Sequence, residues 1–452
     1  MFLDYFIKVF QDNKKNDAII WKGKTYTYDW LLTKYIYWQD VLQSDDIKSG
    51  TVVIIEADFS PNAVSLLLAL IENGCIIVPI TESVSAKKDE FVKIAEGEVL
   101  IKIDNNDNVK ISELPNTSKH KLYKNLKDEN RPGLVLFSSG STGKSKASLH
   151  DMTHLLDKFK LKRHTLRTVT FLLYDHIGGF NTLFYILSNA GLIITLNDRS
   201  PDKVLEAVEK YKVELLPTSP TFLNLILISE AYKRHDINSL KIITYGTEPM
   251  PESTLIRFNQ IFPNIKLLQT YGLSEVGILR SKSKSSNSLW VKVGGEGFDT
   301  RIVDGMLEIK AKSAMLGYLN ADSPFTKDGW FKTGDSVEVN GEYIKITGRK
   351  SEIINVGGEK VYPQEIENII LEVDNVAEAT VYAEKNPIMG NIVCAEVRLL
   401  DNQDHSSYVK LIKMHCMEKL ARFKVPVKIR ITNQNQYSGR FKKRRILNAS
   451  SD

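Results

Sequence analysis

A polar loop at residues 138–146 carries the residue types that bind a chain of phosphates. It consists of Ser-Ser-Gly-Ser-Thr-Gly-Lys-Ser-Lys and follows a short apolar run, Leu134–Phe137, which predicts a buried strand. Glycines let several backbone N–H groups point into one concavity, and hydroxyl and ammonium groups add further donors. Such a set suits a polyanion such as a triphosphate. A solvated, flexible Ser/Gly turn is the alternative for this stretch taken alone.

The same loop nearly matches a second phosphate-binding pattern, the P-loop G-x-x-x-x-G-K-[ST]. Gly143-Lys144-Ser145 fits the end of that pattern, but Ser138 stands where its first glycine belongs. The residues that follow, Lys146–Ser148, stay polar and do not open an apolar-periodic helix. We therefore expect a phosphate-binding loop that is not a P-loop.

Alternating strands and helices must position this loop. Strands are predicted at 18–21, 51–56, 75–80, 169–173, 191–196, 213–216, 241–245 and 266–269, and helices at 61–72, 179–190 and 201–211. Strand–helix–strand spacing of this kind implies parallel βαβ units with helices covering the sheet. The more polar residues 82–130 predict a surface hairpin and a linker.

The pattern changes after residue 281. Ser281–Ser288 predicts a polar loop, and short strands with glycine turns at 300–303, 307–310 and 342–346 indicate an antiparallel subdomain. A helix at 364–372, strands at 376–384 and 392–399 and a helix at 408–420 form a compact module. We predict an α/β fold: residues 1–347 form a large domain of parallel-sheet βαβ units with a small antiparallel β subdomain. Residues 348–452 form a small, mobile α+β domain.

The motifs of the chain resemble, in order, those of the adenylate-forming superfamily, which includes acyl-CoA synthetases, luciferases and peptide-synthetase adenylation domains. Residues 138–146 resemble its phosphate loop, with Lys146 as the terminal lysine and Ala147 in place of the usual glycine. Residues 271–275 match Tyr-Gly-x-[Thr/Ser]-Glu, and 329–335 match Gly-Trp-x-x-Thr-Gly-Asp. The resemblance covers nearly the whole chain. It implies an AMP-forming acid–thiol ligase, and an acyl-CoA synthetase first of all.

The resemblance implies a site for ATP and Mg²⁺. Tyr271 would stack on adenine, and residues 245–249 resemble the segment that lines the other face of the adenine. Ser274 would approach the α-phosphate, and Glu275 would hold magnesium between its carboxylate and the phosphates. Asp335 would bind both ribose hydroxyls through its two oxygens. The expected cofactor-binding residues are Ser138, Ser139, Gly140, Ser141, Thr142, Gly143, Lys146, Gly246, Thr247, Glu248, Tyr271, Gly272, Ser274, Asp335, Arg349 and Gly358.

Residues 348–360 resemble the hinge between the two domains of that superfamily. Arg349 would contact the ribose–phosphate region, and Gly358 would lie beside the pantetheine tunnel, where the absence of a Cβ permits close approach. Ser351 stands where the superfamily commonly has Asp or Lys. This departure leaves the mechanics of the hinge open.

The segment Asp175–Phe180 resembles the His-x-x-Gly segment at the acyl pocket. The implied pocket residues are His176, Gly178, Phe180 and Tyr245, which suit a fatty or an aryl acid. A histidine beside apolar residues is also compatible with ordinary packing. A competing alignment puts Asp175 where peptide-synthetase domains bind an amino group. The Gly-Gly-Phe after His176 favours the first alignment.

The C-terminal basic run, Arg440–Arg445, allows two positions for the adenylation lysine. Alignment of Gly-Lys-x-x-Arg on Gly439 puts Arg440 there, whereas counting from Lys424-Val425-Pro426 puts Lys442 there. We favour Lys442, because a planar guanidinium is not equivalent to an ammonium. A solvated basic tail is the alternative. The implied catalytic residues are therefore Lys442, Lys146 and Glu275, with Arg440 as the competing candidate.

Composition limits the partners and the compartment. A net charge of +5 over 452 residues, with 42% apolar and 25% charged residues, is typical of a globular enzyme and gives no indication of nucleic-acid binding. Three cysteines without CxxC spacing suggest a reducing compartment and no zinc site. We expect a cytoplasmic protein without a signal peptide or membrane span. The expected partners are a carboxylic acid and either CoA or the phosphopantetheine of an acyl or peptidyl carrier protein. A non-catalytic nucleotide-binding homologue is a further alternative.

Overall fold

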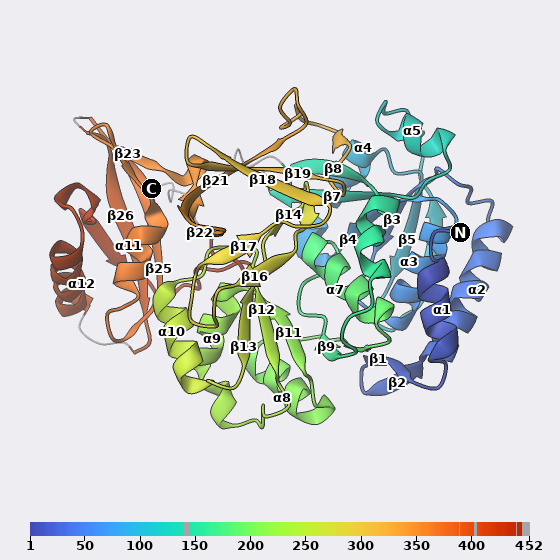
Figure 1. Ribbon diagram of the computed structural model, residues 1–452, viewed down its shortest axis with the longest axis horizontal. Coiled ribbons are helices and arrows are strands. Elements are labelled where there is room, and N and C mark those ends of the chain that lie inside the picture. Colours follow the sequence, from blue (N-terminus) through green and yellow to red (C-terminus); the bar gives the residue numbers. More distant parts are fainter. Residues whose placement is uncertain (140–144, 388, 402–404, 440, 445–452) are drawn as a thin grey trace.

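The computed structural model describes residues 1–139, 145–387, 389–401, 405–439 and 441–444. The N-terminal helices lie at one end of the long axis, and the C-terminal residues, in orange and red, lie at the other (Figure 1). Residues 1–349 contain two seven-stranded sheets and a six-stranded antiparallel sheet. The C-terminal residues add a three-stranded sheet with two helices. The predicted α/β class is confirmed.

The first seven-stranded sheet holds the strands that precede the predicted adenine-binding segments. Its order is β13-β12-β11-β9-β10-β1-β2, and every pair is parallel except β1–β2. Its strands are β1 (Asp17–Trp21), β2 (Lys24–Thr27), β9 (Arg167–Val169), β10 (Leu192–Ile194), β11 (Leu215–Thr218), β12 (Ile242–Tyr245) and β13 (Lys266–Gln269). Helices α8 (Pro201–Tyr211), α9 (Pro220–Ser229) and α10 (Glu252–Ile261) pack on it through one buried apolar cluster.

The second seven-stranded sheet, in the order β20-β8-β7-β4-β3-β5-β6, carries the phosphate loop. Its strands are β3 (Val52–Glu56), β4 (Ile76–Ile80), β5 (Val99–Ile103), β6 (Val109–Glu113), β7 (Gly133–Ser139), β8 (Ser145–Asp151) and β20 (Gly317–Tyr318). The strands β7, β4, β3 and β5 are parallel, whereas β6, β8 and β20 pair antiparallel. The predicted loop therefore joins two antiparallel strands, β7 and β8, with no helix after it, in agreement with a phosphate loop that is not a P-loop.

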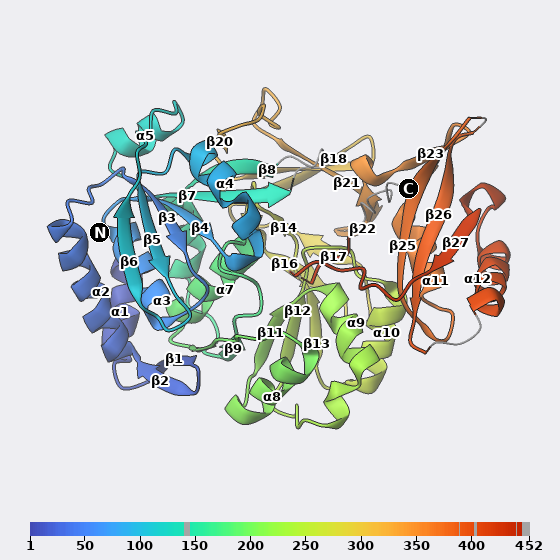
Figure 2. The same cartoon turned by 180° about the vertical axis from the view of Figure 1, so that it is seen from behind.

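A large apolar core lies between the two seven-stranded sheets. It joins strand residues from both sheets to helices α1 (Asp4–Asp12), α2 (Tyr28–Ser44), α3 (Pro61–Glu72) and α7 (Ile177–Ser188). Helix α3 begins with Ser60 as N-cap and Pro61 at its first position, and it is buried along nearly its whole length. Such all-round burial agrees with its apolar sequence. Helices α4 (Lys88–Ala95) and α5 (Tyr123–Asp128) lie on the outside of the second sheet (Figures 1 and 2). Helix α6 (Met152–Leu156) joins the large core through Met152, Leu155 and Leu156.

The six-stranded sheet is antiparallel throughout, in the order β16-β17-β22-β21-β19-β18. Its strands are β16 (Ser281–Ser283), β17 (Val291–Val293), β18 (Phe298–Val303), β19 (Met306–Ala311), β21 (Phe331–Asn340) and β22 (Tyr343–Arg349), and the short hairpin β14 (Gly272–Leu273)–β15 (Gly277–Ile278) precedes it. The predicted antiparallel subdomain is therefore present.

The chain leaves the six-stranded sheet at Arg349. The C-terminal part then contains β23 (Ile354–Val356), β24 (Glu359–Val361), α11 (Pro363–Ile370), β25 (Val376–Asn386), β26 (Gly390–Leu399), α12 (His405–Lys419) and β27 (Lys428–Ile431). It has its own apolar core, formed by α11, α12 and the sheet. The domain boundary at residue 348 stays a prediction, although the change of sheet falls beside it.

Two local predictions are wrong, and a third is right only in part. The strand predicted for 169–173 ends at Val169, because after Thr170 donates to Ile194 the chain turns toward α7. Ser281–Ser283 forms β16 and not a loop, since serine hydroxyls there bind the backbone of β13. The hairpin predicted within residues 82–130 is present as β5–β6. The prediction missed that β5 is also a parallel core strand beside β3, with Val99 and Ile101 buried within a polar stretch.

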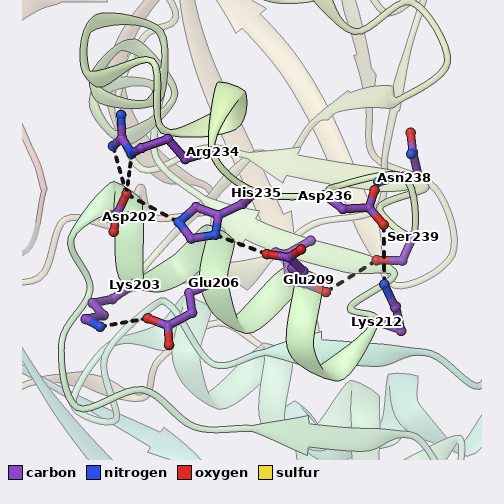
Figure 3. Close-up of polar contacts among 11 residues, drawn as sticks. Asp202, Lys203, Glu206, Glu209, Lys212, Arg234, His235, Asp236, Asn238 and Ser239 are labelled. Atoms are coloured by element: carbon purple, nitrogen blue, oxygen red, sulfur yellow. Dashed lines mark hydrogen bonds and ion pairs between the residues drawn. The ribbon is translucent and has the colours of Figure 1, made fainter.

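A network of charged side chains fastens α8 to the segment that follows α9 (Figure 3). Asp202 accepts from Arg234 and lies 3.3 Å from His235, which also contacts Glu209 at 3.2 Å. Pairs of this exposed kind contribute about 0–1 kcal/mol each. We therefore assign the network a local role in closing the loop after α9.

Candidate active site

Three parallel strands end at the same edge of the first sheet. The last residues of β11, β12 and β13, Thr218, Tyr245 and Gln269, pair in register with one another. The segments 246–248 and 270–272 follow directly after two of these strands. Ligands of open α/β sheets bind outside the carboxyl ends of the strands. The sheet thus brings the two segments predicted to flank adenine side by side.

Gly246 permits the close approach of these two segments. A Cβ at this position would lie 2.5 Å from Thr270 Oγ1 and 2.8 Å from the Thr270 carbonyl oxygen. Any side chain would therefore push the two loops apart. The residue after Gly246, Thr247, has a positive φ of 74°, which for a β-branched residue is strained and typical of functional loops.

A cavity of about 610 Å³ opens beyond this edge, and both domains line it. The predicted site residues that line it are Thr247, Glu248, Tyr271, Gly272, Asp335, Arg349 and Lys442. The C-terminal segment that carries Lys442, in red, leaves the small domain and reaches the large one (Figure 2). The cavity therefore collects predicted nucleotide-binding residues from five separate segments of the sequence.

Asp335 is the centre of a buried polar contact in this cavity. Tyr271 donates its hydroxyl to Asp335 Oδ2 at 2.5 Å, and Arg349 Nε donates to Oδ1 at 2.8 Å. Burial, together with the Asp335 carboxylate, raises the pKa of Tyr271 far above its ordinary value, so the hydroxyl keeps its proton and remains a donor. A carboxylate has about four acceptor positions, so Asp335 can also accept from two ribose hydroxyls.

A second contact joins the phosphate loop to the predicted magnesium residue. Tyr318 donates its hydroxyl to Glu275 Oε1 at 2.7 Å, and Lys146 Nζ lies 5.2 Å from the centre of the Tyr318 ring. Burial and the Glu275 charge raise the pKa of Tyr318 well above its usual value. Tyr318 is a residue that sequence reasoning missed, because it lies 43 positions from Glu275.

Lys87 is a second residue missed by the sequence prediction. Its Nζ donates to Ser145 Oγ at 3.2 Å, and so places another ammonium group beside the end of the phosphate loop. Of the predicted loop residues, Ser138 and Lys146 face each other in the β7–β8 ladder. Gly140, Ser141, Thr142 and Gly143, like Arg440 in the C-terminal run, lie outside the described residues.

His150 supports the turn that carries Ser274 and Glu275. It is fully buried on β8, and its Nε2 lies 2.6 Å from the Ser274 carbonyl oxygen, to which the neutral ring donates. Burial lowers the pKa of His150 to about 4. The folded protein therefore keeps this ring neutral at pH values where the unfolded chain would bind a proton.

We expect the stability of the protein to fall between pH 6.5 and pH 4 because of His150. In this range the unfolded chain binds a proton that the native state excludes, so acid favours unfolding. The native-state pKa of about 4 against an ordinary value of 6.5 gives a total of about 3 kcal/mol. Urea unfolding of the wild type and of His150→Gln at several pH values would measure it. The free energy of unfolding should depend less steeply on pH in His150→Gln than in the wild type, and a variant of the exposed His164 should not show this change. Equal pH dependence in the two variants would contradict the assignment.

A second, smaller cavity adjoins the first. Its large-domain wall is formed by Phe171, Leu172, Leu173, His176 and Arg199. Gly439, Phe441 and Lys442 face this wall from the C-terminal segment. Lys442 Nζ lies 3.1 Å from His176 Nε2. Lys442 thus lines both cavities.

Asp175 and His176, the residues of the two competing alignments, have different surroundings. His176 caps α7, where its Nδ1 accepts from the Gly178 N–H at 3.0 Å, and it lines the smaller cavity. Asp175 is buried and accepts a hydrogen bond from Thr81 Oγ1 at 2.9 Å. The geometry favours the alignment based on His176.

Some predicted residues lie away from these cavities. Phe180 and Tyr245 are buried in the two apolar cores of the large domain, and Gly178 packs against Leu172. Gly358 lies in the turn between β23 and β24 with a φ of 94°, and a Cβ there would meet no atom within 4 Å. Their predicted contacts with substrate stay predictions.

Comparison with known families matches the motifs found in the sequence. The model of the AMP-binding enzyme family matches residues 8–304, and that of the AMP-binding enzyme C-terminal domain matches residues 365–442. The chain belongs to the AMP-binding enzyme family. The predicted membership of the adenylate-forming superfamily is confirmed.

Several curated proteins of this family are similar to the chain over part of their length. An indoleacetate–CoA ligase from Aromatoleum aromaticum is 28% identical over 66% of this chain and 63% of its own length. Acyl-CoA synthetase 7 of Caenorhabditis elegans is 30% identical over 56% of this chain and 49% of its own length. The chain thus spans between about half and two thirds of these relatives.

Solved structures of AMP-binding enzymes share the fold. The anthranilate CoA ligase AuaEII, solved with anthranoyl-AMP, aligns with a TM-score of 0.80 at 18% identity over 95% of this chain and 93% of that chain. ATP-bound MatB from Rhodopseudomonas palustris aligns with a TM-score of 0.79 at 20% identity over 97% and 96%. The two-domain α/β architecture is therefore that of adenylate-forming enzymes.

Neither a membrane-spanning helix nor a cluster of metal ligands occurs in the part of the chain that the structure describes. None of the described helices combines the length and the apolar character needed to cross a bilayer. Within the same residues, no three His, Cys, Asp or Glu side chains gather as a metal cage.

Proposed function

We propose that this AMP-binding enzyme is an acyl-CoA synthetase, which activates a carboxylic acid with ATP and transfers the acyl group to CoA. The position of Lys442 carries the proposal. It is the residue that lines both the cavity with Tyr271 and Asp335 and the smaller, largely apolar cavity with His176. The smaller cavity has a volume of only about 10 Å³, which suits one small group and not a whole acid. A nucleotide in the first cavity and the carboxylate of an acid at the second would meet at the ammonium group of Lys442.

The reaction proceeds in two steps. A carboxylate oxygen of the acid bonds to the α-phosphorus of ATP as the bond to the β-phosphate oxygen breaks, which releases pyrophosphate. The CoA thiol, losing its proton, then attacks the acyl carbon, and AMP leaves with the electron pair of the broken bond. Lys442 and Lys146 offset charge on the phosphates as the first step proceeds, and the walls of the cavities hold the reactants in line.

His176 and Lys442 together form a carboxylate-binding pair. Since Nδ1 of His176 accepts from Gly178, the proton of the neutral ring is on Nε2, which lies beside the Lys442 ammonium. Two N–H donors 3.1 Å apart do not satisfy each other, and the oxygens of a bound carboxylate would give both of them an acceptor. We therefore place the carboxylate of the acid at this pair.

Glu275 fits a magnesium ion that is held jointly with phosphates. Mg²⁺ in ATP sites is usually bound by one or two carboxylates plus phosphate oxygens, which agrees with a lone acid beside the phosphate loop. The ion, when bound, would neutralise phosphate charge. Tyr318 orients the Glu275 carboxylate through its hydrogen bond of 2.7 Å.

Removal of the Tyr318 hydroxyl should weaken the response to magnesium. In Tyr318→Phe, Glu275 loses the donor that orients it, and the Mg²⁺ concentration for half-maximal activity should rise about 10-fold. Titration of activity with MgCl₂ at fixed ATP would measure this shift. Tyr343→Phe is the matched control on the antiparallel sheet, and an equal response of both variants would count against the assignment.

The acid is a fatty or an aryl acid. Phe171, Leu172 and Leu173 line the smaller cavity beside His176 and Arg199, so apolar carbon atoms next to the carboxylate would find apolar neighbours there. The similarity to a relative named indoleacetate–CoA ligase agrees with an aryl acid.

Carboxylate-dependent exchange of labelled pyrophosphate into ATP, over a panel of fatty and aryl acids, tests the first step. Thioester formation with CoA, or with carrier proteins supplied instead, then identifies the acceptor. Exchange followed by acyl-CoA is the expected result. If thioester formed on a carrier protein and not on CoA, the carrier protein would be the acceptor. The absence of exchange with every acid would favour a non-catalytic nucleotide-binding protein.

A further inference from the structure

The C-terminal segment that carries Lys442 is fixed at three points around that residue. On one side, the carbonyl oxygen of Phe441 accepts from Ser219 Oγ at 2.6 Å. On the other, the Lys443 N–H donates to Glu248 Oε2 at 2.9 Å, and Lys443 Nζ donates to Glu367 Oε2 at 2.9 Å. Lys442 is therefore held between two anchored neighbours.

The anchors belong to different domains. Ser219 and Glu248 are in the large domain, at the ends of β11 and β12, whereas Glu367 is on α11 of the small domain. Glu367 is 2% exposed in its side chain, and its Oε1 also accepts from the Val381 N–H at 3.0 Å, so it is fixed within its own domain. Rotation of the small domain would keep the Lys443–Glu367 pair and would break the contacts to Ser219 and Glu248.

Each oxygen of the Glu248 carboxylate accepts one backbone hydrogen bond. Its Oε1 accepts from the Thr221 N–H at the start of α9 at 2.8 Å, while Oε2 accepts from Lys443. The first bond holds the carboxylate in place, and the second depends on the position of the C-terminal segment. Such a carboxylate can secure an incoming backbone N–H without any rearrangement of its own.

The Phe441 side chain adds an apolar contact to the same arrangement. Its ring packs against Phe171 and Phe222 of the large domain, with centroids 5.3 and 5.4 Å away, and stacks on Tyr437 at 5.8 Å. Phe441 also has a positive φ of 51°, which turns the chain between the anchors. The segment is thus docked by both polar and apolar contacts.

We propose that Glu248 is a latch that holds the small domain in the arrangement for acyl-adenylate formation, by securing the Lys443 N–H and so positioning Lys442. This inference rests on the proposed function. It gives Glu248 a positioning role, in place of the adenine contact that the resemblance implies. The latch would serve the first step alone, because rotation of the small domain about the hinge that the resemblance implies would break the Lys443–Glu248 contact.

The test separates the two steps in Glu248→Gln. In Glu248→Gln, one of the two backbone N–H groups, that of Thr221 or that of Lys443, would face an N–H₂ in place of an acceptor oxygen. The kcat of ATP–pyrophosphate exchange should therefore fall about 10- to 100-fold, while the KM for ATP should change by less than about 3-fold. Acyl transfer to CoA from supplied acyl-adenylate should stay within about 2-fold. Glu252→Gln, a change at an exposed acid four positions away, should leave both steps unaltered. Equal slowing of both steps, or unaltered exchange, would overturn the latch.

A second measurement does not depend on activity. Hydrogen exchange of peptides covering residues 441–444 should be faster in Glu248→Gln than in the wild type, because the Lys443 amide loses its acceptor, while peptides of α11 should be unaltered. Unaltered protection of residues 441–444 would reject the latch even if the enzyme proved inactive on every acid. The wild type could lack exchange activity while Glu248→Gln still loses protection at residues 441–444. That result would reject the proposed function and leave the docking of the C-terminal segment on Glu248 intact.

Discussion

Lys442→Ala should lower the kcat of carboxylate-dependent ATP–pyrophosphate exchange by roughly 10²- to 10³-fold, which is the usual effect of removing one preorganised charge-stabilising group. The ammonium of Lys442 lies 3.1 Å from His176 Nε2 and lines both cavities, so it would meet the carboxylate and the α-phosphate together. Negative charge grows on the phosphate oxygens only as the new bond forms. The loss should therefore appear in kcat more than in the KM for ATP.

Three further variants sharpen this prediction. Lys442→Arg should restore only a small part of the activity, because the guanidinium is planar and longer. Lys428→Ala removes an exposed lysine of the same domain, paired with Glu384, and should leave exchange unaltered. Arg440→Ala tests the competing alignment. If Arg440→Ala loses far more activity than Lys442→Ala, the assignment of Lys442 is wrong.

Local sequence signals predicted the elements and the motif loops well. Helix α3 was predicted at its observed bounds, Pro61–Glu72, because Ser60 caps it, Pro61 begins it and Asn73-Gly74 ends it. The loops after β12 and β13 were found because strand residues precede polar and glycine residues. These signals lie within a few positions of one another and act through the backbone.

No such local signal exists for the order of the strands in the sheets, or for the residues that hold the site residues in place. The predicted parallel strands belong to two separate sheets, and β1 pairs with β10, more than 170 positions later. Tyr318, His150 and the docking of Lys443 on Glu248 depend on contacts across 43, 124 and 195 positions. A single sequence does not show which distant residues meet. The residues that contact a ligand can therefore be predicted from their motifs, whereas the residues that hydrogen-bond to them and hold them in place cannot.

Asp335→Asn should raise the KM for ATP about 10- to 100-fold, the effect expected when a hydrogen bond to a charged group is lost. Asp335 is 3% exposed, lines the larger cavity and is held by Tyr271 at 2.5 Å and Arg349 at 2.8 Å. The asparagine keeps one acceptor oxygen and directs an N–H₂ at a neighbouring donor, so it cannot accept from both ribose hydroxyls and keep both supports. Initial rates over a range of ATP concentrations would measure the change.

Tyr271→Phe separates nucleotide binding from stability at the same site. The ring remains, but the buried hydrogen bond to Asp335 is lost, so the free energy of unfolding should fall by about 1–3 kcal/mol in both variants. The KM for ATP should change less than about 3-fold in Tyr271→Phe, because the Asp335 carboxylate and an aromatic face for adenine are retained. If Asp335→Asn destabilised the fold and left the KM for ATP unaltered, Asp335 would be a structural residue, and the ribose would have to be bound elsewhere in the cavity.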